Sequence, residues 1–343
     1  MEPVFHKRPW GARSLAPLFP QMSSLPEPVG EAWMTGNDSR FVEGPFAGQT
    51  LGHAWPEMPP AWSGTRVARG ALFPMLVKFI FAEEKLSVQV HPDDTYAARH
   101  EQAAGGQGKT EMWYTLQARP GAGVLVGLKQ EVTRRTFERA IAEGFAEDCL
   151  ERVSLGEGDA VFVPAGTAHT IGPGLVLCEI QQHSDLTYRV YDYNRRDAQG
   201  RSRPLHVEKA LQVMRFGPQR GGKIEPLRIP RGSATETYFV SCPYFATECW
   251  EFAGSLDAST SPEHFDLLIF LRGQGTISWG REHAVYAPAQ VWMLPAALGD
   301  YALKPEARTS LLRTYVPGDA AELTRRLAAR GVPEAESSRL IYR

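Results

Sequence analysis

The sequence predicts a mainly β protein that contains two related β-barrels in tandem, with a few helices inserted between strands. Many short apolar runs of strand length are separated by the 32 glycines and 26 prolines of the chain, and such a pattern is typical of sandwiches and barrels. Helical periodicity is confined to three segments. A stretch of the first half also recurs in the second half, shifted by 131 residues, so that His169 falls on Asp300.

Strands are expected where apolar residues alternate with polar ones or form short continuous runs. Between Leu86 and Val90 the apolar side chains alternate with Ser87 and Gln89, which indicates a strand with one face toward a core. The continuous runs fit strands that are buried on both faces. In chain order the expected strands are LFPMLVKFIFA, KLSVQVHP, KTEMWYTL, GVLVGL, DAVFVP, GLVLCEI, LTYRVYDY, TYFVSCPYF, FDLLIFL, GTISWG and AQVWMLP.

Three helices and one linker complete the predicted organisation. Apolar residues spaced by four predict a helix in 132–147, a proline at the first turn predicts one in 204–214, and a capping-box-like opening predicts one in 319–329. Composition shifts to Gly, Pro, Arg and Lys around residues 217–236, where we expect the linker. The predicted domains are therefore residues 1–225, which include the N-terminal segment and inserted helices, and residues 226–343.

Charge and cysteine content exclude several classes of protein. The 343 residues carry 37 Lys and Arg against 39 Asp and Glu, a net charge of -2, so no nucleic-acid or anionic membrane partner is expected. The four cysteines are scattered and form no C-x-x-C pair, which argues against a disulfide framework or a cysteine-type zinc site. The start lacks an apolar signal region and no 18-residue apolar span occurs, so we expect a cytoplasmic protein.

Four polar residues in strand and turn contexts predict a metal site. Gln89 and His91 share one face of a strand that Pro92 ends. Glu111 lies in a short apolar strand, where a carboxylate is costly unless it is paired, hydrogen-bonded or bound to a metal. His169 follows a Pro-Ala-Gly turn. One such histidine is more often simply hydrogen-bonded, but the set suits a divalent ion such as zinc.

The motifs QVHPDD, GKTEMWY, VPAGTAHTIG and QQHSDLTYRVYDYNR follow one another between about residues 75 and 215. Together they resemble type I mannose-6-phosphate isomerase (phosphomannose isomerase) in its short bacterial form. The resemblance implies a double-cupin fold, with jelly-roll barrels, and one Zn²⁺ per chain in the first barrel. The implied zinc ligands are Gln89, His91, Glu111 and His169.

The same resemblance implies an activity and further site residues. The activity is the interconversion of mannose 6-phosphate and fructose 6-phosphate by proton transfer through an enediolate. Arg189 and Lys109 are implied as catalytic residues, while Ser87 and Arg195 are implied to bind the phosphate. Asp300 replaces a ligand histidine in the second barrel, which is therefore expected to be metal-free. The expected partner is a small sugar phosphate, with the protein a monomer or a homodimer.

Three other functions remain open from the residues alone. The first is an isomerase of another sugar or sugar phosphate, which would keep the same ligands and change the phosphate contacts. The second is a cupin oxygenase that uses iron, since two histidines with an amide and a carboxylate also suit that metal. The third is a non-catalytic sugar-binding cupin, which would not need Lys109 or Arg189.

Overall fold

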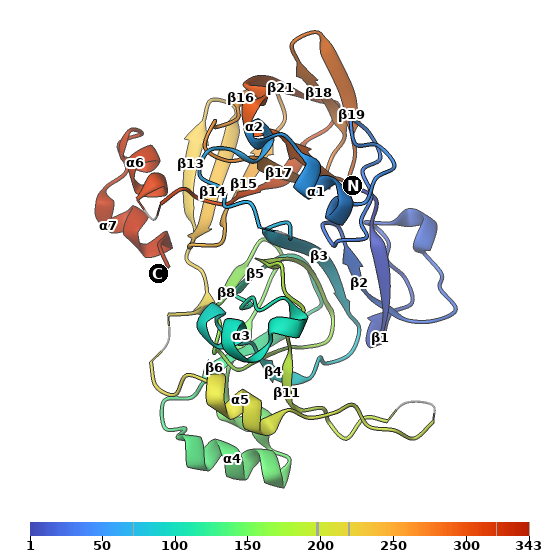
Figure 1. Ribbon diagram of the computed structural model, residues 1–343, viewed down its shortest axis with the longest axis vertical. Helices are drawn as coiled ribbons and strands as arrows, with labels where there is room; N and C mark the ends of the chain where they lie inside the picture. The colour runs from blue at the N-terminus through green and yellow to red at the C-terminus, as the bar shows by residue number, and fades with distance from the viewer. Residues whose placement is uncertain (71, 197–198, 219, 320, 343) are drawn as a thin grey trace.

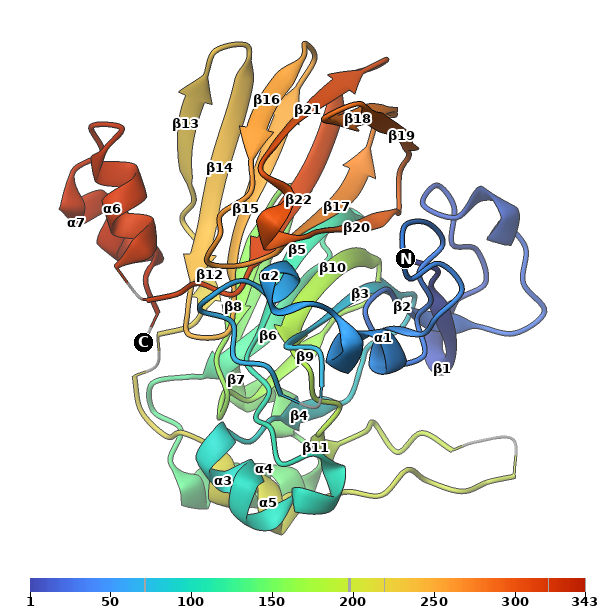
Figure 2. The same ribbon diagram turned by 45° about the horizontal axis from the view of Figure 1, so that its top comes forward.

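The computed structural model describes residues 1–343 apart from 71, 197–198, 219, 320 and 343. Its strands form four sheets, which pack as two pairs, and helices are short and few (Figures 1 and 2). The predicted mainly β fold is confirmed, and each of the eleven apolar runs expected to be a strand contains one. We call the two pairs of sheets the first and the second sheet pair.

The first sheet pair contains a seven-stranded and a five-stranded sheet. Their inner faces share one apolar core, in which Trp113 and Leu177 of the larger sheet meet Val124 and Ile171 of the smaller one. In sheet order the larger sheet consists of β1 (Val4–Ala12), β2 (Val29–Trp33), β3 (Met75–Ala82), β10 (Leu175–Gln182), β5 (Glu111–Ala118), β8 (Ala160–Val163) and β12 (Gly222–Lys223), and the smaller one of β11 (Tyr188–Tyr191), β4 (Val88–Val90), β9 (His169–Ile171), β6 (Gly123–Leu128) and β7 (Leu150–Ser154).

The second sheet pair repeats this plan with six and four strands. Its core joins Trp250 and Leu268 of the larger sheet to Ile277 and Leu303 of the smaller one. In sheet order the larger sheet consists of β13 (Leu227–Arg231), β14 (Ala234–Ser241), β15 (Ala246–Phe252), β22 (Thr309–Tyr315), β17 (Asp266–Arg272) and β20 (Val291–Leu294), and the smaller one of β16 (Leu256–Ser259), β21 (Asp300–Pro305), β18 (Gly275–Trp279) and β19 (Glu282–Tyr286).

The three predicted helices are present but shorter than expected. Thr133 caps the helix in 132–147 and Gly144, with a φ of 82°, ends it. Pro204 precedes the helix in 204–214 instead of opening it. No helix in the described part of the chain has the length and hydrophobicity of a membrane span. The helices are α1 (Leu51–Glu57), α2 (Pro60–Ser63), α3 (Asp94–His100), α4 (Arg134–Glu143), α5 (Val207–Val213), α6 (Glu322–Ala328) and α7 (Glu334–Ser337).

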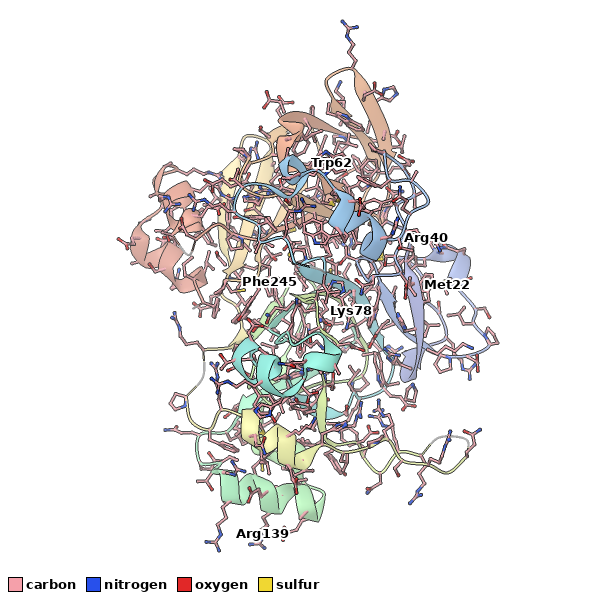
Figure 3. All side chains as sticks on the ribbon, in the orientation of Figure 1. Met22, Arg40, Trp62, Lys78, Arg139 and Phe245 are labelled. Atoms are coloured by element: carbon pink, nitrogen blue, oxygen red, sulfur yellow. The ribbon has the colours of Figure 1, made fainter. Side chains whose placement is uncertain are left out.

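The two sheet pairs lie one above the other, and their larger sheets contribute to one shared core (Figures 1 and 2). The rings of Tyr114 and Phe239 meet at 5.6 Å between centroids, and those of Phe162 and Phe245 at 6.5 Å. Figure 3 shows Phe245 at the junction of the two halves. The apolar outer face of the smaller first sheet is covered by α4 and α5.

The segment expected to be a linker is partly folded into strands. Residues 222–223 pair with β8 of the first sheet pair, whereas residues 227–231 pair with β14 of the second. Pro230 is tolerated because β13 is an edge strand, which needs fewer backbone donors. The change of sheet thus falls between Lys223 and Leu227. Division of the chain at residues 225 and 226 stays a prediction.

The repeat in the sequence corresponds to equivalent strands. The same offset of 131 residues carries β8 (Ala160–Val163) onto β20 (Val291–Leu294). It also carries His169, which pairs with Gln89 across two strands, onto Asp300, which pairs with Ser259. The two sheet pairs therefore place their residues in matching registers.

A buried guanidinium holds the polar end of the second sheet pair together. Arg313 donates two hydrogen bonds of 2.9 Å to the carboxylate of Asp266 and one of 2.8 Å to Glu248. All three side chains are at most 8% exposed. Removing the guanidinium leaves the two buried carboxylates with their outer partners alone, His264 beside Asp266 and Arg326 beside Glu248, which is more costly than the loss of a surface ion pair.

We expect Arg313→Met to lower the free energy of unfolding by about 3–5 kcal/mol, because Asp266 and Glu248 lose their shared cation. The matched control is Arg308→Met, which breaks an exposed pair with Glu251 and should cost less than about 1 kcal/mol. Urea denaturation of both variants measures the two losses. Equal losses would contradict this account of the buried network.

Candidate active site

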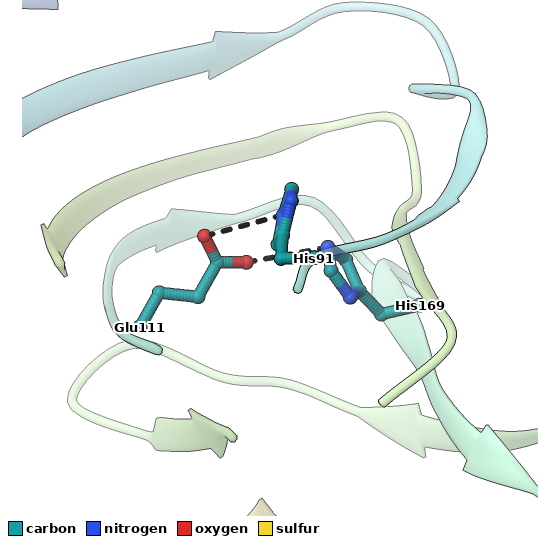
Figure 4. Close-up of side chains that lie close together, drawn as sticks. All are labelled: His91, Glu111 and His169. Carbon is teal, nitrogen blue, oxygen red and sulfur yellow. Dashed lines mark ion pairs between the residues drawn. The ribbon is translucent and has the colours of Figure 1, made fainter. Parts of the chain in front are cut away.

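The four residues predicted as metal ligands meet at the polar end of the first sheet pair. Gln89 belongs to β4 and His91 follows that strand, while Glu111 and His169 are the first residues of β5 and β9. One ligand atom from each of His91, Glu111 and His169 lies within 4.8 Å of the others, and all three residues are fully buried (Figure 4). The structure thus brings these residues together, and their role as metal ligands stays a prediction.

Strand pairing and tight turns bring the four side chains together. Gln89 lies opposite His169 where β4 pairs with β9. The turn before Glu111 passes close to α3: a Cβ on Gly108 would lie 2.6 Å from the backbone nitrogen of Asp94, so only glycine fits there. The Asp94 carboxylate then accepts hydrogen bonds from the backbone of Gly108 (2.8 Å) and from Gln182 (2.9 Å).

Backbone carbonyls orient both imidazoles toward the carboxylate. Nδ1 of His91 lies 2.7 Å from the carbonyl oxygen of Leu186, and Nδ1 of His169 lies 2.9 Å from that of Thr167. Because a carbonyl only accepts hydrogen bonds, each Nδ1 carries the proton and each Nε2 presents its lone pair. A hydrogen bond of this kind behind a metal-binding histidine fixes its tautomer and orientation.

The carboxylate of Glu111 faces these lone pairs without hydrogen-bond partners. Its oxygens lie 3.2 Å from Nε2 of His169 and 3.7 Å from Nε2 of His91. Within the described part of the chain, Nε2 of His91 and both Glu111 oxygens form no hydrogen bond although they are buried. Unsatisfied buried polar atoms are rare and costly. Two lone pairs and a carboxylate that converge in this way fit a divalent metal ion.

The protonation states of the two histidines and Glu111 also favour a metal site. Burial lowers the pKa of His91 to about 3 and also lowers the pKa of His169, so both rings are neutral near pH 7. Burial would raise the pKa of Glu111, but Lys109 and the two histidines outweigh it and lower that pKa. All three side chains therefore have the deprotonated form that binds metals.

Gln89 completes the cluster from the neighbouring strand. Its Nε2 lies 3.2 Å from Nε2 of His169, and its Oε1 accepts a hydrogen bond of 3.4 Å from Ser87. A half turn of the amide brings its oxygen, the atom that binds a metal, to the place of the nitrogen. Ser87 thus lies beside the cluster, as strand alternation predicts.

Lys109 lies inside the cluster, with Nζ 3.3 Å from Oε2 of Glu111 and only 4% of the residue exposed. Burial alone would lower its pKa, but the carboxylates of Glu111 and Glu179 outweigh burial and raise it. The two carboxylates therefore favour the charged form of this ammonium group.

Arg189 is joined to the cluster through Ser87. Its Nε donates a hydrogen bond of 3.2 Å to Ser87 Oγ, and its Nη1 donates one of 3.1 Å to the carbonyl of Pro204. Arg189 and Gln89 are directly opposite in the β4–β11 pair. The predicted catalytic arginine and the predicted phosphate-binding serine are therefore in contact.

Arg195 lies farther along the chain and is engaged with other groups. It donates to the carboxylate of Asp192 at 2.8 Å and to the carbonyl of Lys85 at 2.7 Å. Lys85 is two residues before Ser87, so Arg195 is near that residue, but no described contact joins it to the four clustered side chains. Its predicted phosphate contact stays a prediction.

Sequence reasoning missed a second layer of charge around the cluster. Lys78, on β3 and 2% exposed, lies 3.5 Å from Glu179 and 3.8 Å from Asp185 (Figure 3). Its ammonium group also lies 4.6 Å from the ring centre of Trp33, on the neighbouring strand. The signal in the sequence was one lysine within the apolar run LFPMLVKFIFA. A buried lysine in such a strand needs a carboxylate partner, which sequence alone does not identify.

Two sheet pairs in tandem, one of which carries a buried site with two histidines and a carboxylate, define a class of metal-binding β proteins. Residues 1–116 match the family model described as phosphomannose isomerase type I, catalytic domain. A Bacillus subtilis protein named probable mannose-6-phosphate isomerase GmuF is 35% identical over 314 residues, which cover 89% of this chain and 95% of that protein. The chain belongs to the type I phosphomannose isomerase family.

Two other relatives agree with this assignment. The mannose-6-phosphate isomerase of Streptococcus mutans is 34% identical over 304 residues, which cover 86% of this chain and 92% of that protein. The crystal structure of mannose 6-phosphate isomerase from Bacillus subtilis superposes with a TM-score of 0.82 at 31% identity, covering 91% of this chain and 97% of that one. The similarity therefore extends through both sheet pairs.

We expect His169→Ala to weaken zinc binding by more than about 100-fold, since loss of even an outer-shell partner of a metal ligand costs 10- to 100-fold. His183→Gln is the matched control, because that histidine is also buried but lies outside the cluster. Titration against a competing chelator measures both affinities. Equal affinity of the two variants would show that His169 is not a ligand.

Proposed function

We propose that this chain interconverts mannose 6-phosphate and fructose 6-phosphate with one bound zinc ion. The observation that carries the proposal is the convergence of buried donor atoms at His91, Glu111 and His169, of which Nε2 of His91 and both Glu111 oxygens have no hydrogen-bond partner among the described residues. The chain also aligns over most of its length with proteins named mannose-6-phosphate isomerase. Gln89 with these three residues forms the proposed zinc site. A distant structural neighbour at 17% identity is a mannose 6-phosphate isomerase with bound zinc.

The reaction moves a proton between C1 and C2 of the sugar, and negative charge develops on oxygen in the enediolate. A zinc ion at this site supplies Lewis acidity and a fixed point for the sugar oxygens. Arg189 is always protonated and supports the developing oxyanion electrostatically. Its bond to Ser87 fixes the guanidinium beside the metal ligands, so little reorganisation is needed when charge appears.

The proton carrier is proposed to be Lys109, the buried ammonium group nearest to Glu111. Glu111 and Glu179 raise the pKa of Lys109, which favours a role as a proton donor. To accept a proton it must first transfer its own. Lys78 and Asp185 lie in the same charged layer, so a test of the proton carrier must include them.

The phosphate is proposed to bind at Ser87, which lies between Arg189 and Gln89, and at Arg195. Arginine suits phosphate because its planar fork makes two parallel hydrogen bonds. The Ser87 hydroxyl already contacts both Gln89 and Arg189. A substrate held there would therefore span the distance between the phosphate contacts and the metal.

We propose the partner from the chemistry of the reaction and the location from the state of the cysteines. The proposed partner is a small sugar phosphate, with no nucleic acid or membrane involved, and the protein acts as a monomer or a homodimer. The four cysteines are free thiols, which agrees with a reducing compartment, and we propose a cytoplasmic location. The second sheet pair is proposed to hold no metal, since Ser259 and Asp300 occupy the register of Gln89 and His169.

We expect the purified protein to form fructose 6-phosphate from mannose 6-phosphate, because its donor cluster and Arg189 can together support an enediolate. Chelation should abolish turnover and added zinc should restore it. Added iron should restore no more turnover than zinc does. A coupled assay of fructose 6-phosphate measures each step. Absence of turnover in zinc-loaded protein would refute the proposed reaction and favour another sugar or a binding function.

We expect Arg189→Gln to reduce kcat by about 100- to 1000-fold, as loss of one group that stabilises an oxyanion does. Lys109→Met should also reduce kcat and slow the exchange of the C2 proton with deuterated water. Lys78→Met and Asp185→Asn, measured in parallel, show whether exchange depends on the outer layer. If the wild-type enzyme exchanges none of the transferred C2 hydrogen with deuterated water during turnover, the result would instead indicate a hydride shift.

A further inference from the structure

We propose that Arg203 binds the phosphate of the substrate together with Arg195, and that Asp192 positions both arginines. This inference rests on the proposed function, because it names a further residue that selects a phosphorylated sugar. The observations that carry it are the contacts at the base of the chain segment between β11 and α5, which leaves the first sheet pair and returns beside it (Figures 1 and 2).

A single buried carboxylate holds both arginines. Asp192 directly follows β11 and its side chain is 6% exposed. Arg203 donates two hydrogen bonds to it, from Nε to Oδ2 at 2.7 Å and from Nη2 to Oδ1 at 2.5 Å, and Arg195 donates to Oδ1 at 2.8 Å. Both guanidinium groups are thereby fixed relative to β11.

The segment that carries Arg203 also touches the catalytic arginine. Arg189 donates from Nη1 to the carbonyl of Pro204, the residue after Arg203, at 3.1 Å. The backbone nitrogen of His206 donates to the carbonyl of Arg189 at 2.7 Å, and the Arg189 nitrogen donates to Nδ1 of His206 at 3.3 Å. These bonds place Arg203 next to the Arg189–Ser87 side of the zinc site.

The group carries more positive charge than its own carboxylate neutralises. Burial lowers the pKa of Arg189 and the charge of Arg203 lowers it further, whereas Asp192 raises it and Arg195 lowers it. Three guanidinium groups and one carboxylate leave two positive charges. A phosphate monoester carries about -1.5 to -2 charges near neutral pH, so it matches this excess, whereas a free sugar does not.

Arg203 also has a donor left for a ligand. Its Nε and Nη2 are used by Asp192, but in the described residues Nη1 of Arg203 has no hydrogen-bond partner. Its side chain is 29% exposed, so a ligand can reach it from solvent. A residue with only a structural role would have no need of this excess charge.

The test compares Arg203→Gln with Arg196→Gln, which removes the same charge from the same segment at an exposed arginine bound only to the carbonyl of Gly200 among its described contacts. Zinc-loaded enzyme is assayed with mannose 6-phosphate, and inorganic phosphate is used as a competitive inhibitor. We expect Arg203→Gln to raise both KM and the inhibition constant of phosphate at least about tenfold, with kcat changed less than about threefold. Arg196→Gln should leave all three near wild type.

Two further variants separate binding from folding. Arg203→Lys keeps the charge and should recover part of the phosphate affinity. Asp192→Asn should raise KM in the same direction as Arg203→Gln, and its melting temperature shows whether the segment has also loosened. An unchanged phosphate inhibition constant in active Arg203→Gln would overturn the proposal, and so would a fall in kcat alone.

The proposal and the proposed function fail in different ways. If the wild type does not turn over mannose 6-phosphate, the proposed function fails. Calorimetry with inorganic phosphate still tests Arg203 in that case: weaker binding to Arg203→Gln than to the wild type and Arg196→Gln supports an anion site, and equal binding to all three refutes it.

Discussion

The first sheet pair depends on one constraint, a carboxylate that is buried and has no hydrogen-bond partner among the described residues. Glu111 is 1% exposed, and its oxygens lie near the lone pairs of two neutral histidines and the ammonium group of Lys109. Such a group is stable only if cations surround it. The carbonyls behind the histidines, the turn at Gly108 and the lysines of the charged layer all follow from this requirement. The site is therefore a feature of the protein interior and not an addition to its surface.

The second sheet pair meets the same constraint in a different way. Asp266 is the first residue of β17, as Glu111 is of β5. Its carboxylate is compensated by the guanidinium of Arg313. The β10 residue opposite Lys78 is Glu179, whereas the β22 residue opposite Glu248 is Arg313, so the charges of this pair are exchanged between the two halves. A side-chain cation thus does in one half what we propose a metal ion does in the other.

Much of this organisation could be predicted from the sequence. Alternation placed Ser87, Gln89 and His91 on one face, and the 131-residue repeat identified equivalent strands. Edge strands were missed where Pro230 and charged residues masked their pattern. The charged layer was also missed, because Lys78 meets Asp185 across 107 positions of sequence and local pattern does not report such pairs.

The two parts of the proposed active site place different demands on the fold. The proposed zinc ligands belong to paired strands or adjoin them, and their positions are fixed by sheet register. The arginines proposed to bind phosphate follow β11, outside the sheets, and are held by hydrogen bonds to Asp192 and to backbone carbonyls. The reaction at C1 and C2 requires side chains whose positions are fixed within narrow limits, and paired strands provide such positions. Phosphate binding requires charge and donors, which a less regular segment supplies, so substrate specificity can change there without disturbing the metal cluster.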